Sequence, residues 1–126
     1  MFDSKAADDV WGDDPDNLVS AGFTPSGKAE PVEGGWQVTG RWGWSSGCDH
    51  AGWLIVVTLL PSGPEGEAEP NYCLVPRSDV TITDNWQVMG LAGTGSKTIS
   101  VGRHFCECTD TMTWCSASLV YGDVRR

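Results

Sequence analysis

Strict alternation of side chains between residues 35 and 44 constrains the fold of this chain more than any other feature. The stretch reads GWQVTGRWGW, and side chains two residues apart share one face of a β-strand. One face carries Trp36, Val38, Gly40, Trp42 and Trp44. We therefore expect a long strand over residues 35–44 with an unusually aromatic inner face, whose glycines would let a flat group approach the backbone.

Further short segments rich in Val, Ile, Thr and aromatic residues have the pattern of strands, and clusters of Gly and Pro separate them. These segments cover residues 17–23, 28–32, 53–60, 72–76, 80–88 and 97–101. Residues 61–71 are predicted to form a loop, and no stretch is a convincing helix. We expect an all-β fold with little helix, a closed or nearly closed antiparallel β-barrel of about six to eight short strands, because closure removes exposed strand edges.

Composition and charge limit the classes of function. The 126 residues are 40% hydrophobic, enough for one globular domain with a modest core. A formal net charge of −9 with only eight Lys and Arg argues against binding to nucleic acid or to an anionic membrane. The longest apolar run is too short to span a bilayer, and the acidic N-terminal sequence does not resemble a secretory signal. We expect a cytoplasmic protein whose five cysteines are reduced thiols.

The cysteines do not have the spacing of a metal site. Cys48 is followed directly by Asp49 and His50, and successive side chains of a strand point to opposite faces rather than to one ion. The three later cysteines, Cys106, Cys108 and Cys115, lack a paired C-x-x-C partner. No metal is expected.

Two serines at the end of the aromatic strand raise the question of nucleophilic catalysis. Ser45 and Ser46 lack the G-x-S-x-G pattern, and the two histidines, His50 and His104, are far apart in the sequence. A catalytic triad is disfavoured on this pattern, although its spatial neighbours cannot be seen in a sequence.

The same serines suit a cofactor pocket better. Trp44 followed by Ser45, Ser46 and Gly47 offers a large ring, two hydroxyls and a glycine at a strand end. This combination suits a planar heterocycle that needs a stacking wall and a hydrogen bond at one ring atom. The Gly-rich stretch GLAGTGSKT, residues 90–98, matches no phosphate-binding motif. It is either a tight loop between strands or a loop that contacts a cofactor.

Two long runs, GGWQVTGRWGWSSGCDHAGWLIV and VPRSDVTITDNWQVMGLAGTGSKTISV, occur in this order with a variable loop between them. They resemble the middle β-domain of the acyl-CoA dehydrogenase fold. The branch is that of the two-component (group D) flavin-dependent monooxygenases, similar to the oxygenase component of 4-hydroxyphenylacetate 3-hydroxylase. The resemblance covers about residues 10–105.

The resemblance implies a reaction and a set of site residues. A partner flavin reductase would supply reduced flavin, FMN or FAD, and an aromatic or phenolic substrate would be hydroxylated with O2 as co-substrate. In the family's W-x-S-G pattern the serine hydroxyl lies beside flavin N5. This position is Ser46 here, which is therefore the expected catalytic residue, with Trp44, Ser45 and Gly47 in the wall of the flavin site.

Three further flavin contacts follow from the same resemblance. Thr24 falls where the family has its first flavin-facing strand. Thr94 and Ser96 lie in a loop that matches the family motif GLRGTGS, with Ala92 in the position where arginine is usual.

The family proteins are much longer than this chain, with helical domains on both sides of the β-domain, and the resemblance implies a homo-oligomer. We divide the chain into an acidic leading segment (1–16), a flavin-contacting β-barrel (17–105) and a divergent C-terminal tail (106–126). For the tail two expectations stay open: a truncated or frame-altered end, and a genuinely divergent one. Catalysis by this chain alone is not expected. Two alternatives remain: an acyl-CoA dehydrogenase-like oxidoreductase domain, which Ser-Gly at 46–47 disfavours, and a non-catalytic β-barrel remnant.

Overall fold

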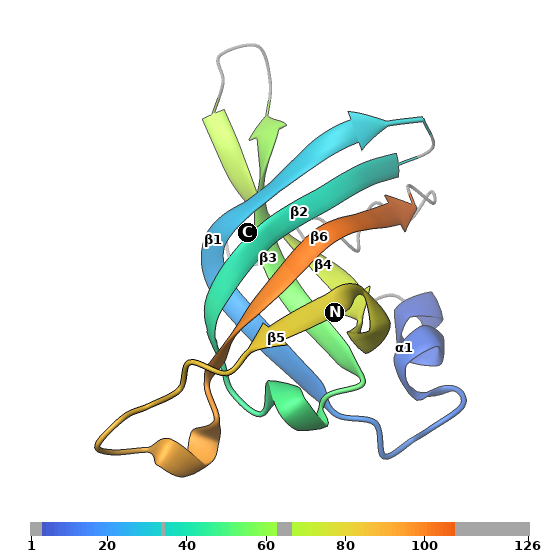
Figure 1. Cartoon of the computed structure of the whole chain (residues 1–126). Coiled ribbons are helices and arrows are strands. Elements are labelled where there is room, and N and C mark those ends of the chain that lie inside the picture. The colour runs from blue at the N-terminus through green and yellow to red at the C-terminus, as the bar shows by residue number, and fades with distance from the viewer. Residues whose placement is uncertain (1–3, 34, 63–66, 108–126) are drawn as a thin grey trace, which may run out of the picture.

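Six strands form one open, mixed β-sheet in the computed structural model, which describes residues 4–33, 35–62 and 67–107 (Figure 1). The strands are β1 (Val19–Val32), β2 (Gly35–Ser45), β3 (Trp53–Ser62), β4 (Glu67–Pro76), β5 (Val80–Thr83) and β6 (Lys97–Glu107). Their order in the sheet is β4-β3-β1-β2-β6-β5. The all-β prediction is confirmed.

The predicted antiparallel barrel, closed or nearly closed, is wrong in two respects. The short strand β5 and the strand β4 remain as the two edges of the sheet, because no pairing joins them in the described residues. In addition, β3 starts at the end of the sheet where β1 starts, with Val19 opposite Trp53, so β1 and β3 run parallel. The other neighbouring strands are antiparallel.

The boundaries of several elements differ from those expected. The predicted strands 17–23 and 28–32 are one strand, β1, whose register with β3 shifts between Gly22 and Gly27. The predicted loop 61–71 is largely strand, since β3 runs to Ser62 and β4 begins at Glu67. Strand β5 ends at Thr83 and is shorter than the predicted segment 80–88.

The helical parts are short: α1 (Ser4–Trp11), and the single turns η1 (Cys48–His50), η2 (Arg77–Asp79) and η3 (Ala92–Thr94). Helix α1 was not expected. Among its side chains whose burial is described, only Val10 is buried, so the segment shows little apolar periodicity. Asn17 fixes the helix to the start of β1: its Nδ2 donates to the Val10 carbonyl at 2.9 Å, and its own carbonyl accepts from Trp11 Nε1 at 2.9 Å. No described helix is long and apolar enough to cross a membrane.

Trp42 lies at the centre of the core. Its ring is fully buried, and its Nε1 donates to the Val57 carbonyl at 2.7 Å. A Cβ added to Gly27 would lie 2.2 Å from Trp42 Cζ2, and one added to Gly22 or Gly40 would lie 2.7 Å from a Trp42 atom. The flat group that these glycines admit is therefore the indole of Trp42 itself. All six strands contribute buried side chains to this core, among them Ala29, Val38, Leu54, Cys73, Val80 and Ile99.

The alternation of β2 changes after Trp42. Trp42 is opposite Ile99 and Ser45 is opposite Lys97, so three steps along β2 match two along β6, which is a β-bulge. Trp44 adopts a left-handed backbone conformation with φ 61° and is 79% exposed. The prediction that Trp44 shares the inner face with Trp42 is wrong because the extra residue turns Trp44 outward and Ser45 inward.

Only the first two residues of the predicted tail 106–126 are described, as the end of β6. Cys108, Cys115 and the rest of that segment lie outside the described residues.

Candidate functional site

Two turns meet at the end of the sheet where β2 ends and β6 begins. One follows Ser45 and leads into η1, and the other contains η3 in the long segment that projects from the sheet between β5 and β6 (Figure 1). The Gly47 N–H donates to the Thr94 carbonyl at 2.9 Å, and Ser45 pairs with Lys97. The site residues predicted at 45–47 and at 94–96 therefore lie together, although about fifty residues separate them in the sequence. These two turns, residues 45–47 and 94–96, form the junction.

A chain of hydroxyls connects the two turns. Ser46 Oγ is 2.7 Å from Ser96 Oγ, and Ser96 Oγ is 2.8 Å from Thr94 Oγ1. Thr94 Oγ1 in turn donates to the Leu91 carbonyl at 2.9 Å. Ser46 is exposed, whereas Ser96 is buried. This hydroxyl chain (Ser46, Ser96, Thr94) therefore connects an exposed serine to a buried one and fixes the position of the Ser46 hydroxyl.

Ser45 has a different place from its neighbour. Its side chain is fully buried, and its Oγ is 2.7 Å from Ser20 Oγ. Ser20 donates its single hydroxyl proton to the Ser46 carbonyl at 2.7 Å, so Ser45 is the donor in the Ser45–Ser20 bond. The structure does not support the predicted cofactor contact of Ser45. Instead, Ser45 and Ser20 fix the backbone that carries Ser46, a role that no sequence signal gave for Ser20 because its partners lie 25 and 26 residues away.

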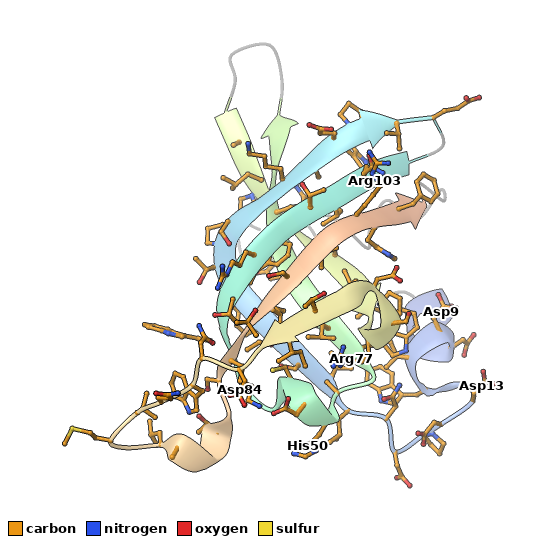
Figure 2. The ribbon with its side chains drawn as sticks, in the orientation of Figure 1. Asp9, Asp13, His50, Arg77, Asp84 and Arg103 are labelled. Atoms are coloured by element: carbon orange, nitrogen blue, oxygen red, sulfur yellow. The ribbon has the colours of Figure 1, made fainter. Side chains whose placement is uncertain are left out.

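An ion pair fastens η1 to β6 beside the hydroxyl chain. Lys97 Nζ lies 2.8 Å from Asp49 Oδ2 and 3.4 Å from Asp84 Oδ2, and Figure 2 shows Asp84 just past the end of β5. The hydrogen bond from Lys97 lowers the pKa of Asp49, and the same bond raises the pKa of Lys97. Burial, followed by the charge of Asp49, raises the pKa of the Cys48 thiol. The sequence pattern around Asp49 suggests at most a metal ligand, and it gives no sign of the pairing with Lys97, which lies 48 residues further along the chain.

Exposed apolar side chains occur on both segments that meet near Ser46. Trp44 and Leu91 are each 79% exposed, and both adopt positive φ. Met89 is fully exposed on the same projecting segment as Leu91. A Cβ added to Gly47 or to Gly93 would meet no atom within 4 Å. Both segments therefore carry exposed apolar side chains and glycines with open space beside them.

Two further candidates have no described hydrogen bond to the hydroxyl chain. Thr24 is exposed on β1, and no described hydrogen bond connects its hydroxyl with the hydroxyl chain. His104 Nδ1 is 2.6 Å from Asp79 Oδ2, so the described partner of this histidine is a carboxylate and not Ser45 or Ser46.

Comparison with known proteins relates the chain to a family, although no protein-family model matches it. The chain is 44% identical over 105 residues to the flavin-dependent monooxygenase oxygenase subunit HsaA of Mycobacterium tuberculosis, covering 80% of this chain and 25% of that protein. It is 41% identical over 99 residues to the oxygenase component of the FADH(2)-dependent resorcinol hydroxylase of Rhizobium sp., covering 79% and 24%.

Solved structures agree with these relatives. The crystal structure of HsaA from M. tuberculosis has a TM-score of 0.76 and 42% identity, covering 85% of this chain and 28% of the other. XiaF from Streptomyces sp., in complex with FADH2 and glycerol, has a TM-score of 0.76 and 32% identity, covering 85% and 27%.

The chain spans about a quarter of the length of the curated relatives that it matches. The predicted family is confirmed by both comparisons. In sequence and in fold, the chain is homologous to a segment of the oxygenase components of flavin-dependent two-component monooxygenases, within the acyl-CoA dehydrogenase-like family.

Proposed function

We propose that this chain forms part of the flavin site of an oxygenase component that hydroxylates an aromatic or phenolic substrate with reduced flavin and O2. A flavin reductase would be the partner that supplies the reduced flavin, and the assembled oxygenase would be a homo-oligomer. The names of the relatives at 41% and 44% identity support the class of reaction. The observation that carries the proposal is the exposed residue Ser46, whose hydroxyl bonds to the buried Ser96 and which lies two residues after the exposed Trp44.

The residues at this junction fit a flavin in their chemistry. A flavin offers a broad flat ring with polar atoms along its edges, which calls for an apolar surface beside a hydrogen-bonding group. Trp44 provides the apolar surface and Ser46 the hydroxyl. A bulky residue with φ 61° carries backbone strain of about 1–3 kcal/mol, and such strain is common at ligand sites. Trp44 combines this strain with an exposed ring, and neither feature stabilises the isolated domain.

Each residue then has a defined task. When bound, reduced flavin supplies the electrons that activate O2 for hydroxylation. Ser46 would hydrogen-bond to the polar edge of the ring at N5, and Trp44 would cover the ring and exclude water. Gly47, whose φ of 68° suits glycine, would let the backbone turn away beneath the ligand. Ser96 and Thr94 would hold Ser46 in place rather than touch the ring.

Anaerobic equilibrium dialysis of the 126-residue chain against reduced FMN, and separately against FADH2, tests this proposal. Loss of one hydrogen bond in Ser46→Ala should weaken binding about fivefold. Ser78→Ala is the matched control, because Ser78 is an exposed serine in η2 and outside the hydroxyl chain, and it should bind like the wild-type chain.

Two results would overturn the proposal. If S46A binds reduced flavin as tightly as the wild-type chain, Ser46 is not a contact residue. If the wild-type chain binds neither reduced flavin, the domain would be better explained as a β-sheet remnant without a cofactor.

A further inference from the structure

We propose that Thr94 and Ser96 are positioning residues that turn the Ser46 hydroxyl proton inward, so that Ser46 offers only its lone pairs to a ligand. Ser46 would then accept a hydrogen bond and not donate one. Which hydroxyl donates and which accepts along the hydroxyl chain follows from hydrogen bonds within this protein. The identity of the ligand as flavin rests on the proposed function.

The order of donors and acceptors along the hydroxyl chain is fixed at Thr94. A carbonyl oxygen cannot donate, and a threonine hydroxyl has one proton. Thr94 Oγ1 lies 2.9 Å from the Leu91 carbonyl, so the Thr94 proton is committed to that carbonyl. The Leu91 carbonyl also accepts from the Thr94 N–H at 3.1 Å and from Trp86 Nε1 at 3.2 Å, and the two bonds from Thr94 fix that residue on the turn that contains η3.

The donors in the other two contacts follow from the bond of Thr94 to Leu91. Ser96 Oγ is 2.8 Å from Thr94 Oγ1, a typical O–H···O separation, and only Ser96 has a proton available for it. The Ser46–Ser96 contact at 2.7 Å then has one possible donor, Ser46. Two facing lone pairs at these distances would repel, and Ser96 is buried, where an unmade hydrogen bond is costly. The three contacts are satisfied together in this direction only.

Because Ser46 can only accept a hydrogen bond, it matches one redox state of a flavin better than the other. Reduced flavin carries a hydrogen on N5 and donates there, whereas oxidised flavin has a bare N5 that needs a donor. Ser46 as found matches the reduced form. To serve the oxidised form, Ser46 must break its bond to Ser96, and the loss of one such bond changes the dissociation constant about fivefold.

Binding of both redox forms to the 126-residue chain tests this step. We would measure the dissociation constants of reduced and oxidised FMN and take their ratio for wild-type, S96A and T94V chains. S96A frees the Ser46 proton, and T94V allows Ser96 to donate to Ser46, so in both variants the preference for reduced FMN should fall about fivefold. Thr81→Val is the matched control, since Thr81 is an exposed threonine of β5, and it should keep the wild-type ratio.

A purely structural role for Thr94 and Ser96 would weaken both redox forms equally, and an unchanged ratio would therefore contradict the inference. A neutron structure of the flavin-free chain decides the direction independently. Deuterium should lie on Ser46 toward Ser96 and on Ser96 toward Thr94. Deuterium on Ser96 pointing to Ser46 would overturn the inference even if flavin binds. Failure to bind either form, with the deuterium positions as expected, would overturn the proposed function alone.

Discussion

A single added methyl group at Gly27 should strongly destabilise the sheet. The new Cβ would lie 2.2 Å from Trp42 Cζ2 and 3.0 Å from Thr58 Cγ2. The indole cannot move aside easily, because its ring is fully buried and its Nε1 is bonded to the Val57 carbonyl at 2.7 Å. Overpacking of a core usually costs 1–3 kcal/mol, and contact with a rigid ring places Gly27→Ala at about 3 kcal/mol.

Gly43→Ala is the matched control on β2. A Cβ at Gly43 would meet no atom within 4 Å, and Gly43 is not among the glycines with positive φ. Its free energy of unfolding should stay within about 1 kcal/mol of the wild-type value, with an increase more expected than a decrease.

Urea unfolding at equilibrium provides the measurement, with the slope checked so that a shifted midpoint reports stability alone. Replacing the indole by a smaller ring in Trp42→Phe should reduce the additional cost of G27A, so the two changes should be non-additive. Equal stability of G27A and G43A would refute the glycine-lined packing of Trp42.

Three further predictions concern the junction. Trp44→Gly should leave the free energy of unfolding unchanged or raise it by up to about 1 kcal/mol, because it relieves the positive φ. The same change should weaken the binding of reduced flavin in dialysis. A large loss of stability would contradict this prediction. Because the pKa of Asp49 is lowered by Lys97, its contribution is present above the ordinary value of 3.8 and is lost as the pH falls through the lowered pKa. The stability gap between wild type and Asp49→Asn in acid titrations should therefore close at low pH, and a constant gap would argue against the ion pair. Cys48 is buried with a raised pKa, so site-resolved alkylation should modify it only under unfolding conditions; rapid labelling of the native chain would contradict its burial.

Local patterns predicted the strands well where one face of the chain is buried. The alternation from Trp36 to Trp42 and the apolar run beginning at Trp53 both fall on observed strands. Burial of one face imposes a period of two that a sequence shows directly. The family resemblance predicted the class of protein, which the comparisons confirm. It also singled out Ser46 as the expected site residue.

The features that depend on pairing between distant segments could not be read in this way. The bulge that turns Trp44 outward depends on the register between β2 and β6, and the bonds of Ser20 and Ser96 to the Ser45–Ser46 pair span 25 to 50 residues. The parallel pairing of β1 with β3 likewise depends on where the chain re-enters the sheet. Single-residue patterns do not encode such partners, so an open sheet and a closed barrel look alike in the sequence.

The central claim is that the junction around Ser46 is the surface that meets reduced flavin. Amide chemical shifts of the 126-residue chain, recorded by NMR during anaerobic addition of reduced FMN, test it most directly. We expect the largest shifts at residues 44–47 and 91–96, with small changes around the His104–Asp79 pair, in which His104 lies seven residues along β6 from Lys97 and its Nδ1 is 2.6 Å from Asp79 Oδ2. Shifts concentrated at that pair, or no shifts at the junction at saturating FMN, would contradict the account.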